Sequence, residues 1–292
     1  MVPGLDSPRE KLRNPRILER PEETRTVFIV ERSSMSEIHT DIRDDVREHY
    51  AKVAKGERDC CSSDTSRCSV SEQIGYSKED IESLPKEAEM GLGCGNPISF
   101  AGLKLGEVVL DLGSGGGVDC FLASKIVGVT GKIIGVDMTP EMVSKARNNA
   151  TRGNYQNVEF RLGEIEHLPA GDNTVDAVIS NCVINLSPSK LQVYKEAYRV
   201  LKPGGRLAVA DMVALQPLPD YLKNDVAAYT GCLAGAELVN QLEAWLAEAG
   251  FENVQIRVRQ SSREFIQGDA GEGKFEHYIA SADVTALKPM PG

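Results

Sequence analysis

Between residues 107 and 215, two kinds of hydrophobic pattern alternate along the chain. Short runs rich in Val, Ile and Leu predict buried strands, and longer stretches with apolar residues every three or four positions predict helices. The predicted strands span residues 108–112, 132–137, 158–162, 175–180 and 206–212. Strands that alternate with helices at this spacing are typical of a doubly wound α/β fold, a mostly parallel sheet with helices on both faces.

The flanking regions carry patterns that extend this fold. A helix before residue 56 is predicted from apolar residues that share one face, Ile38, Ile42, Val46, Tyr50 and Val53. Ser77, with Asp80 three positions later, predicts the capped start of a short helix. After residue 215 we expect a helix over 236–249 and two strands, over 254–258 and 278–284, which bring the sheet to seven strands.

These patterns divide the chain into four parts. Residues 1–35 combine four prolines with scattered charges, and we expect a disordered extension there. Residues 36–96 form an N-terminal helical and loop segment that carries cysteines. Residues 97–215 form the main α/β domain, and residues 216–292 form a small C-terminal α+β part that completes the sheet.

Composition and charge exclude several classes of protein. The chain of 292 residues is 41% hydrophobic and 26% charged, as ordinary globular proteins are. Its net charge of −10 argues against a nucleic-acid partner, and the lack of a long apolar run argues against a membrane partner. No secretory pattern accompanies the seven cysteines, so we expect the reducing cytoplasm as the compartment. We also expect a monomer.

A glycine-rich turn follows the first strand of the main domain. It reads Asp111-Leu-Gly-Ser-Gly-Gly-Gly117, and glycines at this place let the backbone approach a ligand closely. Asp137 ends the second strand, where a carboxylate suits the two hydroxyls of a ribose. A nicotinamide-binding turn would need a glycine where Val118 stands, and it would lack the acid before the first glycine.

The order acid-x-Gly-x-Gly-x-Gly resembles motif I of the class I S-adenosylmethionine-dependent methyltransferases, and the Leu-Lys-Pro-Gly-Gly turn at residues 201–205 resembles theirs as well. The resemblance implies a Rossmann-like methyltransferase sheet that binds S-adenosylmethionine within residues 97–215. Carried over position by position, the residues that contact the cofactor are Asp111, Gly113, Ser114, Gly115, Asp137, Met138, Glu164, Ile165 and Asn181.

Cys182 follows the fourth strand, at the edge where such a sheet holds its acceptor. Oxygen or nitrogen acceptors call for a carboxylate, His or Tyr that removes a proton, and the sequence around Cys182 offers none. A free cysteine is often only a small buried hydrophobe, as we expect of Cys120 inside its helix. Cys94 and Cys232, however, lie beside glycines rather than within apolar runs.

A set of three thiolate ligands favours a soft, thiophilic metal or metalloid. Zinc would favour four ligands with close Cys-x-x-Cys pairs, which Cys94, Cys182 and Cys232 do not form. Trivalent arsenic takes three sulfurs in a pyramid and keeps a lone pair, which could attack a sulfonium methyl without a general base. The four histidines show no ligand spacing.

The segments Ser-Asn-Cys182-Val-Ile-Asn-Leu, Leu-Gly-Cys94-Gly-Asn-Pro and Gly-Cys232-Leu-Ala-Gly-Ala resemble the signatures of the arsenite S-adenosylmethionine methyltransferases. The resemblance implies that Cys182 and Cys232 hold arsenic through all steps and that Cys94 joins them for the first. It also implies a fourth, N-terminal cysteine that pairs with Cys94 and is reset by thioredoxin or another dithiol. Cys61 is our choice for it, with Cys60 and Cys68 left open.

We therefore expect an enzyme that moves methyl groups from S-adenosylmethionine to thiol-bound trivalent arsenic, in which residues 216–292 contribute to arsenic binding. Two alternatives remain. One is a methyltransferase of a quinone or another small organic acceptor, which would need no cysteine triad. The other is a thiol-based arsenic sensor, which would have no use for the glycine turn or Asp137. Two features depart from the family pattern, the extension before about residue 36 and the absence of cysteines after Cys232.

Overall fold

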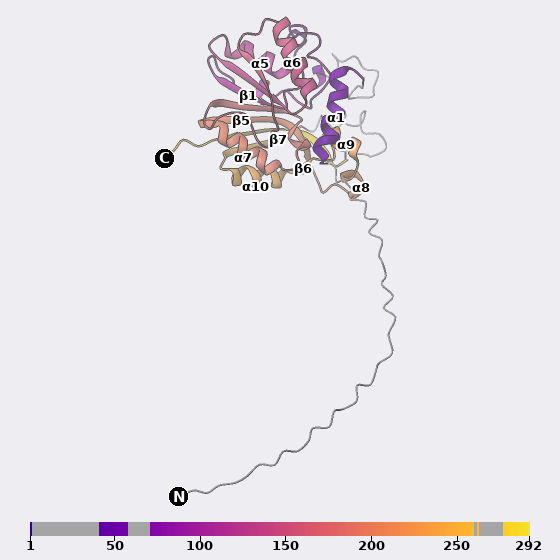
Figure 1. The fold of residues 1–292 in the computed structure, drawn as a ribbon, viewed down its shortest axis with the longest axis vertical. Coiled ribbons are helices and arrows are strands. Elements are labelled where there is room, and N and C mark those ends of the chain that lie inside the picture. The colour runs from indigo at the N-terminus through magenta and orange to yellow at the C-terminus, as the bar shows by residue number, and fades with distance from the viewer. Residues whose placement is uncertain (2–40, 58–70, 260–261, 263–276) are drawn as a thin grey trace. The chain divides into compact units, whose positions relative to one another are not determined.

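The computed structural model describes residue 1 and residues 41–57, 71–259, 262 and 277–292 (Figure 1). Apart from Met1, the predicted extension over 1–35 lies outside the described residues, and so do Cys60, Cys61 and Cys68. The described residues from 41 onward belong to one unit, Thr40–Gly292. None of the helices described in that unit has the length and apolar character needed to cross a bilayer.

The sheet has the predicted doubly wound topology. Its strands run in the order β3-β2-β1-β4-β5-β8-β7, and β1 to β5 are parallel, whereas β8 is antiparallel to both β5 and β7. The bounds are β1 (Val108–Leu112), β2 (Lys132–Asp137), β3 (Val158–Leu162), β4 (Val175–Asn181), β5 (Leu201–Ala214), β7 (Glu252–Arg259) and β8 (Ile279–Leu287). A two-residue strand, β6 (Glu237–Leu238), pairs with the end of β5.

Helices cover both faces of the sheet (Figure 1). The longer ones are α1 (Ile42–Lys55), α5 (Val118–Val127), α6 (Pro140–Arg152), α7 (Lys190–Val200) and α10 (Val239–Ala249). Short ones are α3 (Lys78–Glu82), α4 (Ile98–Ala101), η1 (Ile184–Leu186), α8 (Asp220–Lys223) and α9 (Val226–Thr230). Helices α5 and α6 pack on one face and α7 and α10 on the other, so the class predicted from the sequence is confirmed.

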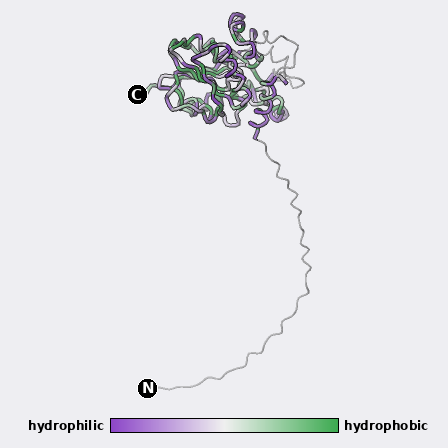
Figure 2. Tube along the Cα trace, turned by 45° about the horizontal axis from the view of Figure 1, so that its top comes forward, coloured by the Kyte–Doolittle hydropathy of each residue, from purple (hydrophilic) through white to green (hydrophobic). Residues whose placement is uncertain are grey.

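The two faces of the sheet hold two separate hydrophobic clusters, and β1 contributes to both. Val109 packs with α5 and α6, whereas Leu110 and Leu112 pack with α7 and α10, because successive side chains on a strand point to opposite faces. Full burial of side chains of this size contributes about 1.5–3 kcal/mol each. Figure 2 shows the hydrophobic stretches gathered inside the folded unit.

The boundaries differ from the predicted ones where tertiary contacts intervene. The helix expected from residue 236 begins at Val239, because residues 237–238 pair with β5. The predicted cap at Ser77 is confirmed, with Ser77 and Asp80 forming a capping box. The four- and five-residue helices α4, α8 and α9 were not predicted, because they are too short to show a period.

Candidate active site

The site lies at the carboxyl ends of β1 and β4, where the order of the sheet reverses. The chain leaves β1 toward β2 on one side and leaves β4 toward β5 on the other. Leu112 pairs with Ser180 across these two strands, so the glycine turn and the Cys182 turn leave the sheet side by side. Ligands of open α/β sheets bind in the crevice at such a switch point.

The glycine turn needs its glycines at two positions for different reasons. Gly113 has a φ of +66°, and a Cβ there would lie 2.3 Å from Cγ2 of Val183, in the turn after β4. Gly115 has a φ of +49°, but the nearest atom to a Cβ there would be Cε of Met90 at 3.8 Å. The backbone at Gly115 therefore has room above it for a ligand.

Asp137 ties this turn to the end of β2. Its Oδ2 accepts a hydrogen bond from the backbone N–H of Gly115 at 2.9 Å, and its Oδ1 accepts one from that of Thr139 at 2.8 Å. Burial raises the pKa of Asp137, and these two hydrogen bonds oppose the rise. The carboxylate predicted to bind ribose thus also holds the conformation of the turn.

Asp111 and Cys120 form a buried pair beneath the turn. Sγ of Cys120 donates to Oδ2 of Asp111 at 3.2 Å, and both side chains are buried. Burial raises the pKa of Asp111 well above its usual value, and the nearby Asp119 adds to the shift. The predicted core position of Cys120 is confirmed.

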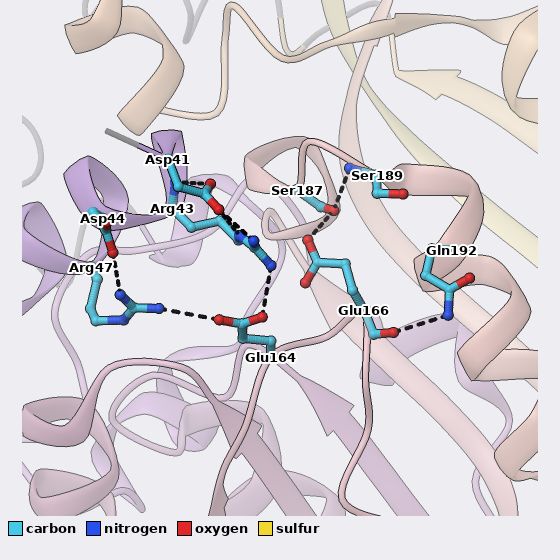
Figure 3. Close-up of polar contacts among 9 residues, drawn as sticks. All are labelled: Asp41, Arg43, Asp44, Arg47, Glu164, Glu166, Ser187, Ser189 and Gln192. Atoms are coloured by element: carbon cyan, nitrogen blue, oxygen red, sulfur yellow. Dashed lines mark hydrogen bonds and ion pairs between the residues drawn. The ribbon is translucent and has the colours of Figure 1, made fainter. Parts of the chain in front are cut away.

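After β3, the predicted cofactor residue Glu164 contacts the N-terminal helix (Figure 3). Arg43 Nη1 and Arg47 Nη2 of α1 donate to its two carboxylate oxygens at 2.7 and 3.3 Å. Of its neighbours, Ile165 is buried in the core, and Glu166 accepts a hydrogen bond from Ser187. Whether Glu164 and Ile165 also contact a cofactor stays a prediction.

The three predicted arsenic ligands come together from three distant segments. Cys94 precedes α4, Cys182 follows β4 and Cys232 follows α9. Cys182 packs against the hydrophobic cluster that contains Cys94 and against the one that contains Cys232. Its sulfur, that of Cys94 and a carboxylate oxygen of Asp211 all lie within 4.8 Å of one another.

Two of these cysteines have left-handed backbone conformations, which are uncommon for residues other than glycine. The φ of Cys182 is +57° and that of Cys232 is +64°. Hydrogen bonds between segments distant in sequence hold both turns: Cys182 N donates to the carbonyl of Ala210 at 2.8 Å, and Sγ of Cys232 donates to the carbonyl of Cys182 at 2.7 Å. Backbone strain of this kind concentrates at functional sites and costs about 1–3 kcal/mol per residue.

The thiols are held in the neutral form. Burial raises the pKa of Cys94 to about 11, and the nearby Asp211 adds to the rise. At Cys182 the hydrogen bond from Cys232 works against the shift, but the bond to Cys94 and burial raise the pKa well above its usual value. The pKa of Cys232 is also raised, first by its bond to Cys182 and then by burial.

Asp211, in β5, is a site residue that the sequence analysis missed. Its carboxylate accepts hydrogen bonds from the backbone N–H groups of Ile184, Asn185 and Met212 and from the Asn185 side chain, at 2.8–3.3 Å. Burial raises its pKa to about 6. Because both oxygens already accept two hydrogen bonds, Asp211 holds the Cys182 turn rather than offering a free ligand atom. An acid within an otherwise apolar strand was the available signal.

Helix α1 also reaches the thiol centre. Its buried Val46 packs with Leu186 and Cys232, and the hydroxyl of Tyr50 donates to the carbonyl of Thr230 at 3.2 Å. The predicted redox cysteine Cys61 lies outside the described residues.

Comparisons with known proteins agree with this arrangement. Residues 103–250 match the family described as a methyltransferase domain. The chain is 49% identical to an arsenite methyltransferase of Halobacterium salinarum over 85% of its own length and 66% of that protein. It is 30% identical to the ubiquinone/menaquinone biosynthesis C-methyltransferase UbiE of Haemophilus ducreyi, over 65% of this chain and 73% of that one.

Among solved structures, the chain resembles CrArsM, an arsenic(III) S-adenosylmethionine methyltransferase from Chlamydomonas reinhardtii. The identity is 32% and the TM-score 0.55, over 79% of this chain and 76% of that one. The chain spans about two thirds or less of the length of the curated arsenite methyltransferases that it matches. Sheet order, glycine turn and sequence similarity agree, and the chain belongs to the class I S-adenosylmethionine methyltransferases, in the arsenite methyltransferase family.

Proposed function

We propose that this protein transfers methyl groups from S-adenosylmethionine to trivalent arsenic bound by Cys94, Cys182 and Cys232, which yields methylated arsenicals and serves arsenic detoxification. The observation that carries the proposal is that three cysteines from distant segments meet beside the glycine turn: the sulfurs of Cys94 and Cys182 lie within 4.8 Å of each other, and Sγ of Cys232 donates to the carbonyl of Cys182. An organic acceptor would give such a cluster no role.

The cofactor residues proposed from the sequence fit one side of the crevice. The backbone at Gly115 has the conformation and space for a closely approaching ligand, and Gly113 and Ser114 belong to the same turn. Asp137 ends β2 and Met138 follows it, at the adjacent strand end, where a carboxylate can accept hydrogen bonds from ribose hydroxyls. When bound, S-adenosylmethionine supplies an electrophilic methyl group, which suits the lone pair of arsenic.

Neutral thiols suit a neutral substrate. Arsenite at neutral pH is an uncharged trihydroxide, and each thiol that replaces a hydroxyl releases one water, with its proton leaving in that water. Three such exchanges form three As–S bonds without a net change of charge. The raised pKa values of the three cysteines therefore fit arsenite, and the protein acts mainly by positioning.

After methylation, arsenic has lost its lone pair and needs two electrons. We propose that the Cys61 thiol attacks the sulfur of Cys94, which forms a disulfide and breaks the As–S bond. The electron pair of that bond stays on arsenic and a proton is released, leaving methylarsenic(III) on Cys182 and Cys232. A dithiol such as thioredoxin then reduces the disulfide. We also propose that the enzyme works as a cytoplasmic monomer.

The test is to incubate the purified protein with arsenite, S-adenosylmethionine labelled in the methyl group and a thiol reductant, and to separate the products by chromatography. Label in methylarsenicals supports the proposal. Label only in an added menaquinone precursor identifies an organic acceptor instead, and arsenic binding without transfer identifies a sensor.

A further inference from the structure

Asn181, at the end of β4, holds the peptide on both sides of Cys94. Its Oδ1 accepts a hydrogen bond from the backbone N–H of Cys94 at 3.1 Å, and its Nδ2 donates to the carbonyl of Gly95 at 2.8 Å. A single side-chain amide thus fixes the direction of this loop, and with it the place of the Cys94 sulfur.

The Cys94 loop packs closely against the sheet, so its backbone has little room to move. A Cβ at Gly93 would lie 2.9 Å from Nδ2 of Asn181, and one at Gly95 would lie 2.6 Å from Cβ of Ala210. The φ of Gly93 is +118°, which only glycine adopts readily. A displacement of Asn181 would therefore be transmitted to Cys94 directly.

Two buried groups decide which way the Asn181 amide faces. Asp119, in the first turn of α5, accepts from Nδ2 of Asn181 at 3.3 Å and from the hydroxyl of Tyr76 at 2.6 Å. Nδ2 also donates to the Tyr76 oxygen at 2.9 Å. Because a carboxylate can only accept, it keeps the NH₂ group on its own side and turns Oδ1 toward Cys94.

We propose that Tyr76, Asp119 and Asn181 are positioning residues for Cys94, and that they give the site its activity on arsenite as distinct from monomethylarsenite. The inference rests on the proposed function. Arsenite needs three protein thiols, whereas monomethylarsenite already carries one As–C bond and needs two. Asn181 makes no comparable pair of contacts to Cys232, and Asp211 holds the turn of Cys182 separately. Loss of the Tyr76 network should therefore affect the three-thiol substrate most, and an unchanged affinity for S-adenosylmethionine separates this role from the cofactor contact predicted for Asn181.

The test is Tyr76→Phe, which removes one hydroxyl and keeps the ring that packs in the core. With excess reductant we expect kcat/KM for arsenite to fall about tenfold or more, as for the loss of a hydrogen bond to a charged partner, mostly through KM. Activity on monomethylarsenite should stay within about twofold of wild type. Cys94→Ser should show the same split in stronger form.

Tyr155→Phe is the matched control, because Tyr155 belongs to the same apolar cluster and stacks on Phe121 at 4.4 Å between ring centroids. It should leave both activities unchanged. Asp119→Asn provides a second variant of the network if Tyr76→Phe folds poorly, and it should show the same split. An equal loss on both substrates, or no loss on arsenite in either variant, overturns the inference.

A second measurement does not depend on methylation. Cys94 is 4% exposed, so alkylation by iodoacetamide, followed by peptide mass mapping in the absence of arsenic, should be slow in the wild type. Tyr76→Phe should accelerate labelling of Cys94 severalfold and leave Cys120 unchanged. Unaltered labelling of Cys94 contradicts the positioning role, even if the protein methylates a different acceptor, so this failure is distinguishable from failure of the proposed function.

Discussion

The glycine turn and the thiol centre lie at the same edge of the sheet, but they depend on the chain in different ways. The glycine turn is one short segment between β1 and α5, held by Asp137 at the next strand end. The thiol centre joins residues far apart in sequence, 87 positions between Cys94 and Asn181 and 50 between Cys182 and Cys232.

The glycine turn and the thiol centre also differ in the interactions that fix their backbone conformations. In the glycine turn the backbone conformation is intrinsic to glycine, so the turn needs few partners. In the thiol centre, Cys182 and Cys232 take left-handed conformations that they disfavour; Ala210 and Asp211 of β5 hold the Cys182 turn, and Sγ of Cys232 donates to the carbonyl of Cys182. A local binding loop thus sits beside a centre that exists only because the whole sheet is folded.

The largest expected effect tests the thiol centre. Cys182→Ser should lower methylation of both arsenite and monomethylarsenite about a hundredfold or more, because a hard hydroxyl replaces the central sulfur and misplaces the arsenic. Cys232→Ser should behave alike. The measurement is the rate of methylated product formation for each variant with excess reductant. A Cys182→Ser enzyme that methylates monomethylarsenite at the wild-type rate would refute the three-thiol centre.

The next effect tests the glycine turn. Asp137→Ala should weaken S-adenosylmethionine binding about tenfold or more, measured by calorimetry, because a hydrogen bond to a charged group contributes about 1.5–3 kcal/mol. It should also lower the free energy of unfolding, since the N–H groups of Gly115 and Thr139 lose their acceptor. Asp137→Asn keeps one acceptor oxygen and should lose less. Unchanged cofactor affinity in both variants would remove Asp137 from the binding site.

A smaller effect is expected from a cysteine that the proposed chemistry does not use. Cys120→Ser should lower the free energy of unfolding by about 1 kcal/mol, the usual size for a conservative buried change, because a hydroxyl can still donate to Asp111. Both methylation rates should stay near wild type. A large loss of activity at unchanged stability would mean that Cys120 belongs to the chemistry.

The smallest effect concerns the contact of α1 with the cofactor side. Glu164 is about one third exposed, so Glu164→Gln should cost less than about 1 kcal/mol of stability, and added salt should shrink the difference. Arg43→Gln, which removes one of the two arginines that donate to Glu164, should lower the free energy of unfolding by a similar amount. If Glu164→Gln instead weakens S-adenosylmethionine binding tenfold while Arg43→Gln does not, Glu164 acts mainly as a cofactor ligand.

Much of the fold was predictable because its signals are local. The strands β1 to β4 begin and end within a residue or so of the predicted positions, since buried parallel strands read as apolar runs between turn residues. The edges of β5 and α10 were not predictable from local signals: β5 begins at Leu201 because that residue pairs with Val175, and residues 237–238 pair with β5 before α10 begins. The roles of Tyr76, Asp119 and Asp211 were hardly indicated by the sequence, since a polar residue between apolar neighbours does not show which distant residue it hydrogen-bonds.

The sequence by itself determined the α/β class and the place of the glycine turn, and it indicated the three cysteines that we propose as arsenic ligands, because spacing, glycine and cysteine carry that information locally. Only the tertiary structure decided that the three thiols meet, that Asp211 and Asn181 hold two of them and that α1 reaches both sides of the site. The physical reason is that hydrogen bonds and burial act between neighbours in space, and a sheet makes neighbours of strand ends that the sequence keeps far apart.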